Sequence, residues 1–129
     1  MIVVDSSVWI AQLRGNDIAT IERLKNINDT KDILVGDLIL LEVLQGARSE
    51  PEALLIEKGL RQFPVQQMLS DRLLAKAAGN YRELRKRGIT VRNTVDVVIG
   101  TFCIEENHSL LHNDRNFDPI AKYLGLTVA

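Results

Sequence analysis

Short apolar runs alternate with longer amphipathic stretches along the whole of this 129-residue chain. The apolar runs are rich in Val, Ile and Leu and are too short for helices, which is typical of buried strands. We expect strands at residues 1–4, 33–35, 65–68, 109–112 and 126–128. Between them, apolar spacing and capping residues predict helices at residues 8–14, 17–28, 38–47, 51–62, 71–87, 93–106 and 118–124.

This alternation of strands and helices predicts an α/β fold in three layers. A central parallel sheet of about five strands would be covered by helices on both faces. No internal repeat, low-complexity stretch or linker divides the sequence, so we expect a single domain over residues 1–129. In sheets of this kind, binding sites lie beyond the carboxyl ends of the strands. Polar residues that follow strands are therefore the first candidates for chemistry.

Composition narrows the function classes only slightly. Apolar residues make up 46% of the chain and charged residues 26%, as in ordinary globular proteins. The single cysteine, Cys103, excludes an intrachain disulfide and a cysteine-based zinc site, and it favours the reducing cytoplasm. The net charge of −1 argues mildly against a nucleic-acid binder. Basic residues are nevertheless concentrated late in the chain, where they form either a solvated helix face or one wall of a basic groove: Arg82, Arg85, Lys86, Arg87 and Arg92.

Two carboxylates stand out in the first half of the sequence. Asp5 directly follows the first predicted strand, where it would either cap the next helix or face a site. Glu42 interrupts a helix whose other residues, from Leu38 to Leu44, are apolar. A carboxylate on so apolar a helix must be neutralised, paired with a cationic side chain or bound to a cation. Glu42 is therefore the most informative acid of the chain.

Two further carboxylates occupy equivalent places in the second half. Asp96 lies three residues after Asn93, which would be the cap of an apolar helix, so a capping arrangement is the alternative to a site. Asp114 follows the fourth predicted strand and could equally belong to an ordinary polar turn. If the first and fourth strands are neighbours, all four acids meet at one edge of the sheet. Such a cluster repels itself unless a cation lies within it, and all-oxygen ligation favours Mg²⁺ or Mn²⁺.

These features, in their order along the chain, resemble the PIN domain, and in particular the VapC-like toxins of prokaryotic toxin–antitoxin pairs. The resemblance is carried by residues 4–10 (Val-Asp-Ser-Ser-Val-Trp-Ile), by Glu42 and Asp96 in their helices, and by residues 110–117 (Leu-Leu-His-Asn-Asp-Arg-Asn-Phe). It spans essentially the whole sequence. It implies a three-layer α/β/α PIN-like fold and a Mg²⁺-dependent endoribonuclease, with Mn²⁺ as a substitute, that acts on tRNA or rRNA. It also implies a homodimer and a cognate antitoxin.

By position, the resemblance assigns Asp5 and Asp96 as the main metal ligands, with Glu42 and Asp114 completing the catalytic acidic cluster. Ser7 would support Asp5 by hydrogen bonding. The resemblance also gives the basic residues a role, which is to contact the RNA backbone. The candidates for this contact are Arg82, Arg85, Lys86, Arg87, Arg92 and Arg115.

The sequence departs from the PIN pattern at two positions. His112 stands where Thr or Ser is common, and Asn116 stands where a further Asp is common. A histidine at a strand end is usually structural, although it could also contact phosphate. Asp118 could replace the acid missing at residue 116, but before Pro119 it is better placed for helix capping. These departures affect the fourth acid of the predicted site and leave Asp5, Glu42 and Asp96 untouched.

Other functions explain the pattern less well. A phosphatase of the haloacid dehalogenase type would need a second Asp where Ser7 stands, and a receiver domain would need an Asp after the third strand. The stronger alternative is a PIN-like module that binds RNA or protein without catalysis, its acids serving only as helix caps. The Leu/Ile stripe of residues 50–62 is either core or part of a groove for a protein partner.

Overall fold

The computed structural model describes residues 1–16, 18–27 and 29–129, and its centre is a parallel sheet. The strands are β1 (Ile2–Val4), β2 (Ile33–Gly36), β3 (Val65–Gln66) and β4 (Ser109–Leu111), in the order β3-β2-β1-β4. The predicted strand at residues 126–128 contributes only a parallel bridge between Leu110 and Val128. The sheet therefore has four strands in the described part of the chain, instead of about five, because the last segment meets β4 at a single residue.

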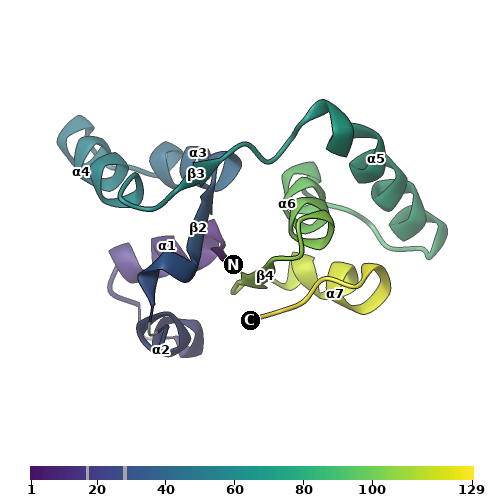
Figure 1. The fold of residues 1–129 in the computed structure, drawn as a ribbon, viewed down its shortest axis with the longest axis horizontal. Helices are drawn as coiled ribbons and strands as arrows, with labels where there is room; N and C mark the ends of the chain where they lie inside the picture. The colour runs from purple at the N-terminus through teal and green to yellow at the C-terminus, as the bar shows by residue number, and fades with distance from the viewer. Residues whose placement is uncertain (17, 28) are drawn as a thin grey trace.

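Helices cover both faces of this sheet, which confirms the three-layer α/β/α prediction. In Figure 1 the helices of the first half of the chain lie on one side of the sheet and those of the second half on the other. The first group is α1 (Ser6–Leu13), α2 (Ala19–Lys25), α3 (Asp37–Gln45) and α4 (Glu50–Leu60). The second group is α5 (Asp71–Lys86), α6 (Thr94–Glu105) and α7 (Asp118–Leu124). Two 3₁₀ turns, η1 (Thr30–Asp32) and η2 (Arg115–Phe117), were not predicted.

Most helix bounds agree with the prediction to within a few residues. The predicted helix at residues 17–28 corresponds to α2, and its expected first and last residues, Asp17 and Asn28, lie outside the described part of the chain. None of the helices described is long and apolar enough to cross a membrane.

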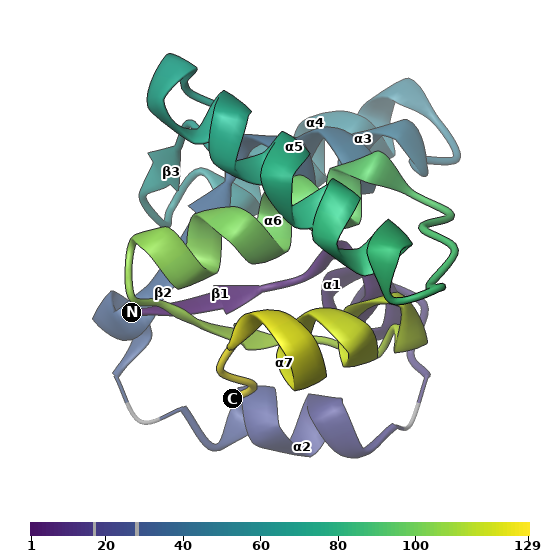
Figure 2. The ribbon, with the colours of Figure 1, turned by 90° about the vertical axis from the view of Figure 1, so that its right-hand side faces the viewer.

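The core lies on both faces of the sheet, and α6 is its most deeply buried helix. Figure 2 shows α6 between α5 and the strand β1. All residues from Asp96 to Cys103 are buried. This position explains why the sequence of α6 is apolar on every side, because a helix with neighbours all round has no solvated face. It also places the acid near the start of α6 deep inside the molecule.

The acid at the start of α3 makes a long-range contact instead of a helix cap. Asp37 is the first residue of α3, and Gly36 occupies the cap position without a side-chain hydrogen bond. The Asp37 Oδ1 atom accepts the backbone N–H of Met68 at 3.0 Å as well as that of Leu38 at 2.8 Å. Asp37 therefore ties the segment after β3 to the start of α3, a long-range contact that a local capping signal does not reveal.

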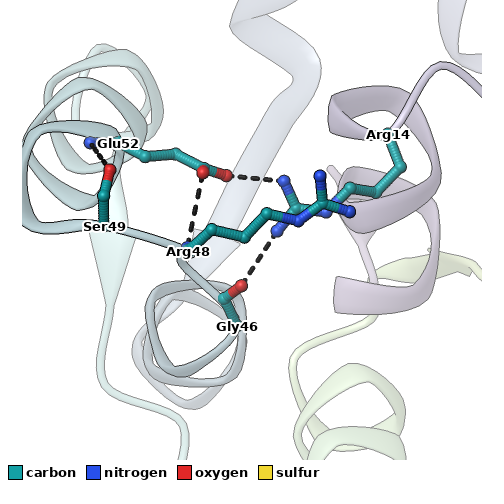
Figure 3. Close-up of polar contacts among 5 residues, drawn as sticks. All are labelled: Arg14, Gly46, Arg48, Ser49 and Glu52. Carbon is teal, nitrogen blue, oxygen red and sulfur yellow. Dashed lines mark hydrogen bonds and ion pairs between the residues drawn. The ribbon is translucent and has the colours of Figure 1, made fainter.

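An ion pair at the end of α1 fixes that helix against α3 and α4 (Figure 3). The Arg14 guanidinium donates to Glu52 Oε1 at 2.6 Å and to the carbonyl oxygen of Gly46 at 2.9 Å. The partly buried Glu52 also accepts the backbone N–H of Arg48 at 3.3 Å, and its own N–H donates to Ser49 Oγ at 3.2 Å. The Arg14 guanidinium lowers the pKa of Glu52 through this hydrogen bond. One arginine thereby links three helices.

Tight packing of α6 yields a first prediction. A Cβ atom at Gly100 would lie 2.8 Å from Cγ2 of Ile120, which is 1% exposed. Gly100→Ala should therefore destabilise the protein by about 1–3 kcal/mol in spite of the higher helix propensity of alanine. At Gly79 in α5 the nearest atom would be Arg82 Nη2, at 3.7 Å, so Gly79→Ala should stabilise by about 0.5–1 kcal/mol. Urea denaturation measures both, and equal effects of the two substitutions would contradict this packing.

Candidate active site

The order of the strands reverses at β1 and β4, which defines the crevice beyond the carboxyl ends of these two strands. The chain builds the sheet outward from β1 to β3 and then returns to place β4 on the other side of β1. Ligands bind at such a reversal, beyond the carboxyl ends of the strands. The backbone N–H of Asp5 donates to the carbonyl oxygen of Leu111 at 2.9 Å, so the two strands stay paired up to the edge. The residues that follow β1 and β4 therefore lie side by side.

Asp5 is the most deeply buried acid at this edge, with 2% of its surface exposed. Its Oδ2 atom accepts two hydrogen bonds from Ser7, one from the backbone N–H at 3.0 Å and one from the hydroxyl at 2.6 Å. Asp5 therefore caps α1, which is the alternative to a site role that the sequence left open. Its Oδ1 atom, however, is buried without any hydrogen-bond partner. A cap needs one oxygen, so capping alone leaves the second oxygen unexplained.

Glu42 projects from α3 towards the start of α1. Its Oε1 atom accepts the hydroxyl of Ser6 at 3.2 Å. Among the residues described, no ion pair includes Glu42, so the structure does not support the cationic side-chain partner that the sequence left open. The contribution of Ser6 was missed, although its place beside Asp5 and Ser7 was the available signal.

Asp96 is in the first turn of α6 and is 4% exposed. Asn93 caps that helix by accepting the backbone N–H of Val95 at 3.0 Å. The side chain of Asp96 instead accepts the amide of Asn116 at 3.2 Å, on Oδ2. The hydrogen-bond partner of Asp96 is therefore Asn116, on the other side of the crevice. Asp96 does not take part in the predicted capping arrangement.

Asp114 belongs to the loop between β4 and η2. Its Oδ1 atom accepts the backbone N–H of Asn116 at 2.9 Å, and its own N–H donates to Nδ1 of His112 at 3.2 Å. The His112 ring packs against Phe117, with 5.0 Å between the ring centroids. Ser7 Oγ also accepts the backbone N–H of Asn113 at 3.0 Å, which joins this loop to Asp5. These contacts give His112 a structural role. Asp118 lies in the first turn of α7, where its side chain is exposed.

The four acids interact electrostatically. Burial raises the pKa of Asp5, and the charge of Asp114 adds to this effect. Burial also raises the pKa of Glu42, followed by the charges of Asp5 and Asp114. The pKa of Asp96 rises to about 7, first through burial and then through the other three acids, against the lowering effect of Asn116. The structure therefore brings together all four predicted acids.

Each of these carboxylates keeps an oxygen available. In the described residues, the protein hydrogen bonds reach only one oxygen of each acid: Oδ2 of Asp5, Oε1 of Glu42, Oδ2 of Asp96 and Oδ1 of Asp114. An all-oxygen set with a buried, unpartnered Oδ1 atom on Asp5 fits a hard divalent cation. Among the described residues, no three His, Cys, Asp or Glu side chains are close enough together to coordinate one ion directly. The donor set therefore suits an ion that keeps several of its waters.

The predicted basic residues divide into two groups. Arg92 and Arg115 line a small cleft that also contains Asp96 and Asn116. The basic residues of α5 do not line this cleft. Arg87 pairs with Glu83 at 3.2 Å and lies over the Tyr123 ring, 4.7 Å from its centroid.

The whole chain is similar to known proteins. The family model for the PIN domain matches residues 2–123. The chain is 31% identical over 134 residues to the ribonuclease VapC11 of Mycobacterium tuberculosis and to the VapC ribonuclease Mb1587 of Mycobacterium bovis, covering 100% of this chain and 98% of each relative.

Among solved structures, the VapBC2 complex of Rickettsia felis, bound to a promoter DNA fragment, matches with a TM-score of 0.79 and 17% identity over 100% of this chain and 98% of that chain. The DNA-bound VapBC complex of Salmonella typhimurium matches with a TM-score of 0.78 and 19% identity over 99% of this chain and 96% of that chain. These structural matches establish the fold.

The raised pKa of Asp96 predicts an unusual dependence of stability on pH. Between the unfolded pKa near 3.8 and the folded value of about 7, the folded state binds more protons than the unfolded state. The free energy of unfolding of the metal-free protein should therefore fall as pH rises through this window. At pH 8, Asp96→Asn should be more stable than the wild type by about 1–2 kcal/mol, allowing for solvent screening, and the difference should vanish near pH 4.

Urea denaturation in EDTA at several pH values measures this difference. The matched variant Asp71→Asn removes an exposed acid in the first turn of α5 and should follow the wild-type pH dependence. A constant difference between the wild type and Asp96→Asn across the pH range would show that the pKa of Asp96 is the same in the folded and unfolded states.

Proposed function

Since this chain belongs to the PIN domain family, we propose that it is a metal-dependent endoribonuclease, the toxin component of a toxin–antitoxin pair. The relatives at 31% identity are named ribonucleases, and they align over the whole of this chain. In this proposal Asp5, Glu42, Asp96 and Asp114 form the catalytic site, and the reaction is hydrolysis of an RNA phosphodiester bond. As the resemblance implies, tRNA or rRNA is the substrate, and the protein acts in the cytoplasm.

One observation carries the proposal. Asp5 is only 2% exposed, its Oδ1 atom has no partner, and burial together with the charges of neighbouring acids raises the pKa values of Asp5, Glu42 and Asp96. An uncompensated carboxylate oxygen in such a place costs stability. Proteins keep such an arrangement where it performs chemistry, because perturbed titratable groups concentrate at functional sites.

The ion that fits this donor set is Mg²⁺, with Mn²⁺ as a substitute. Asp5 and Asp96 would hold it, and Glu42 and Asp114 would complete the set through waters. A bound divalent cation would stabilise negative charge on the scissile phosphate and lower the pKa of a water molecule. Protein donors hold the acids in place: Ser7 donates to Asp5, Ser6 donates to Glu42, and Asn116 donates to both Asp96 and Asp114.

The antitoxin partner has a candidate surface between α1 and α4. A cavity of about 610 Å³ is lined there by Trp9, Leu13, Leu55, Ile56 and Phe63, with the Arg14–Glu52 pair at its side. Ile56 and Leu60 of the predicted Leu/Ile stripe are buried, but Leu54 and Leu55 are 69% and 72% exposed. The stripe thus serves the core on one side and offers apolar surface on the other. We propose that the antitoxin covers this groove.

A second apolar groove suits a second copy of the chain. It has a volume of about 430 Å³ and lies between α5 and α6, lined by Leu69, Leu74, Ala78, Tyr81 and Val98. Leu74 is 56% exposed and Leu69 is 38% exposed. We propose that the homodimer forms here, since an isologous contact would bury both leucines of each copy.

Cleavage of RNA tests the active-site proposal. The wild type should degrade total RNA in Mg²⁺ or Mn²⁺ and lose this activity in EDTA, and Asp5→Asn should lower the rate by at least about 100-fold. Mg²⁺ should also raise the melting temperature of the wild type, but not that of Asp5→Asn, because binding to the native state stabilises it. The matched variant Asp71→Asn should behave as the wild type.

The outcomes separate the two functions that remain. If the protein is a nuclease, Mg²⁺ raises its melting temperature and the wild type cleaves RNA. A non-catalytic PIN-like binding module predicts a melting temperature indifferent to Mg²⁺ and no cleavage beyond that of Asp5→Asn.

Sedimentation of the purified protein tests the dimer. The wild type should sediment as a dimer at micromolar concentration, and Leu74→Arg should sediment as a monomer, because it places a charge in the apolar interface. Leu54→Arg changes a comparably exposed leucine on α4 and should leave the dimer intact. A dimer that survives Leu74→Arg would locate the contact elsewhere.

A further inference from the structure

A narrow cleft opens beside Asp96, on the α6 side of the acidic crevice. Its volume is about 80 Å³. This space accepts a phosphate group but is too small for a nucleobase. Its polar lining is Thr90, Arg92, Asn93, Asp96, Arg115 and Asn116, and Leu84, Ile89 and Ile120 are among its apolar lining.

Two guanidinium groups at this cleft are free to bind an anion. Arg92 and Arg115 are both exposed, and no ion pair in the described part of the chain includes either of them. Arginine binds phosphate through paired, charge-assisted hydrogen bonds. The cleft therefore combines the shape for one phosphate group with two side chains suited to bind it.

The residues of α5 offer no such site. Arg82 and Arg85 line the apolar groove between α5 and α6, and Arg87 is occupied by Glu83 and Tyr123. The basic run that looks continuous in the sequence is thus divided by the fold. Of this run, only its last member, Arg92, lines the cleft beside Asp96, together with Arg115, which is distant in sequence.

The neighbouring acid restricts which anion can bind. Asp96 also lines the cleft, so a free anion would be repelled by it. A phosphodiester chain meets this restriction, because one phosphate can lie at the acids while the adjacent phosphate contacts the arginines. We propose that this cleft binds the RNA phosphate next to the scissile one, held by Arg92 and Arg115. The inference rests on the proposed nuclease function and names the side of the acidic site along which the RNA strand runs.

Binding of a short single-stranded RNA to Asp5→Asn protein tests this assignment. Fluorescence anisotropy between 50 and 200 mM KCl gives the affinity and its salt dependence. In that background, Arg92→Gln and Arg115→Gln should each weaken binding about 5-fold and reduce the slope of log K against log salt by about 0.7, the value for one phosphate contact of a single strand. Arg61→Gln should change neither quantity, since Arg61 follows α4 at the opposite edge of the sheet, where β3 begins.

A chemical double-mutant cycle locates the phosphate. Methylphosphonate linkages, introduced one position at a time, remove single charges from the RNA. At the position next to the cleaved bond, the effects of the methylphosphonate and of Arg115→Gln should be non-additive, because both remove one contact. At distant positions the two effects should add.

The inference and the proposed function fail in different ways. If the wild type cleaves RNA but both arginine variants keep the wild-type affinity and salt slope, the phosphate site is wrong and the nuclease stands. If the variants weaken only antitoxin binding, the cleft serves a protein carboxylate and the inference is equally wrong. If the wild type neither binds nor cleaves RNA, both are overturned.

Discussion

Parallel pairing of β1 with β4 is the contact on which the rest of this structure depends. It joins the first strand of the chain to the last, across most of the sequence, and it reverses the order in which the sheet grows. Without it, Asp5 and Asp114 would follow strands at unrelated places. With it, both acids meet at one edge, and α6, which precedes β4, is brought back so that the buried Asp96 faces them.

The acidic site opposes the stability of the fold that creates it. Burial and mutual repulsion raise the pKa of Asp5, Glu42 and Asp96, so each proton removed from this crevice weakens the metal-free protein. Hydrogen bonds from Ser6, Ser7 and Asn116 relieve part of this repulsion. The repulsion that these hydrogen bonds do not relieve produces a negative potential that would attract a divalent cation. The same repulsion therefore destabilises the metal-free fold and supports the proposed chemistry.

The sequence could predict those parts of the fold and the site that local patterns encode. The apolar runs identified the strands, and the apolar surroundings of Glu42 required a partner of some kind. Long-range contacts had no such signal. The link from Asp37 to Met68, the ion pair of Arg14 with Glu52, and the position of Asn116 between two acids all join segments that are distant in sequence. For the same reason the basic run appeared to be one surface, whereas the end of α5 separates Arg92 from the others.

The ion pair of Arg14 with Glu52 lies at the end of a helix that has two roles, and this has an evolutionary consequence. This helix carries Asp5, Ser6 and Ser7 at its start, and Trp9, Leu13 and Arg14 line the groove along its later part. A substitution on its groove face therefore disturbs the helix that orients two of the acids. The exposed leucines of α4 do not belong to a helix that also orients the acids. If the antitoxin binds this groove as proposed, substitutions on α4 can change the choice of partner while α1 continues to orient Asp5 and Glu42.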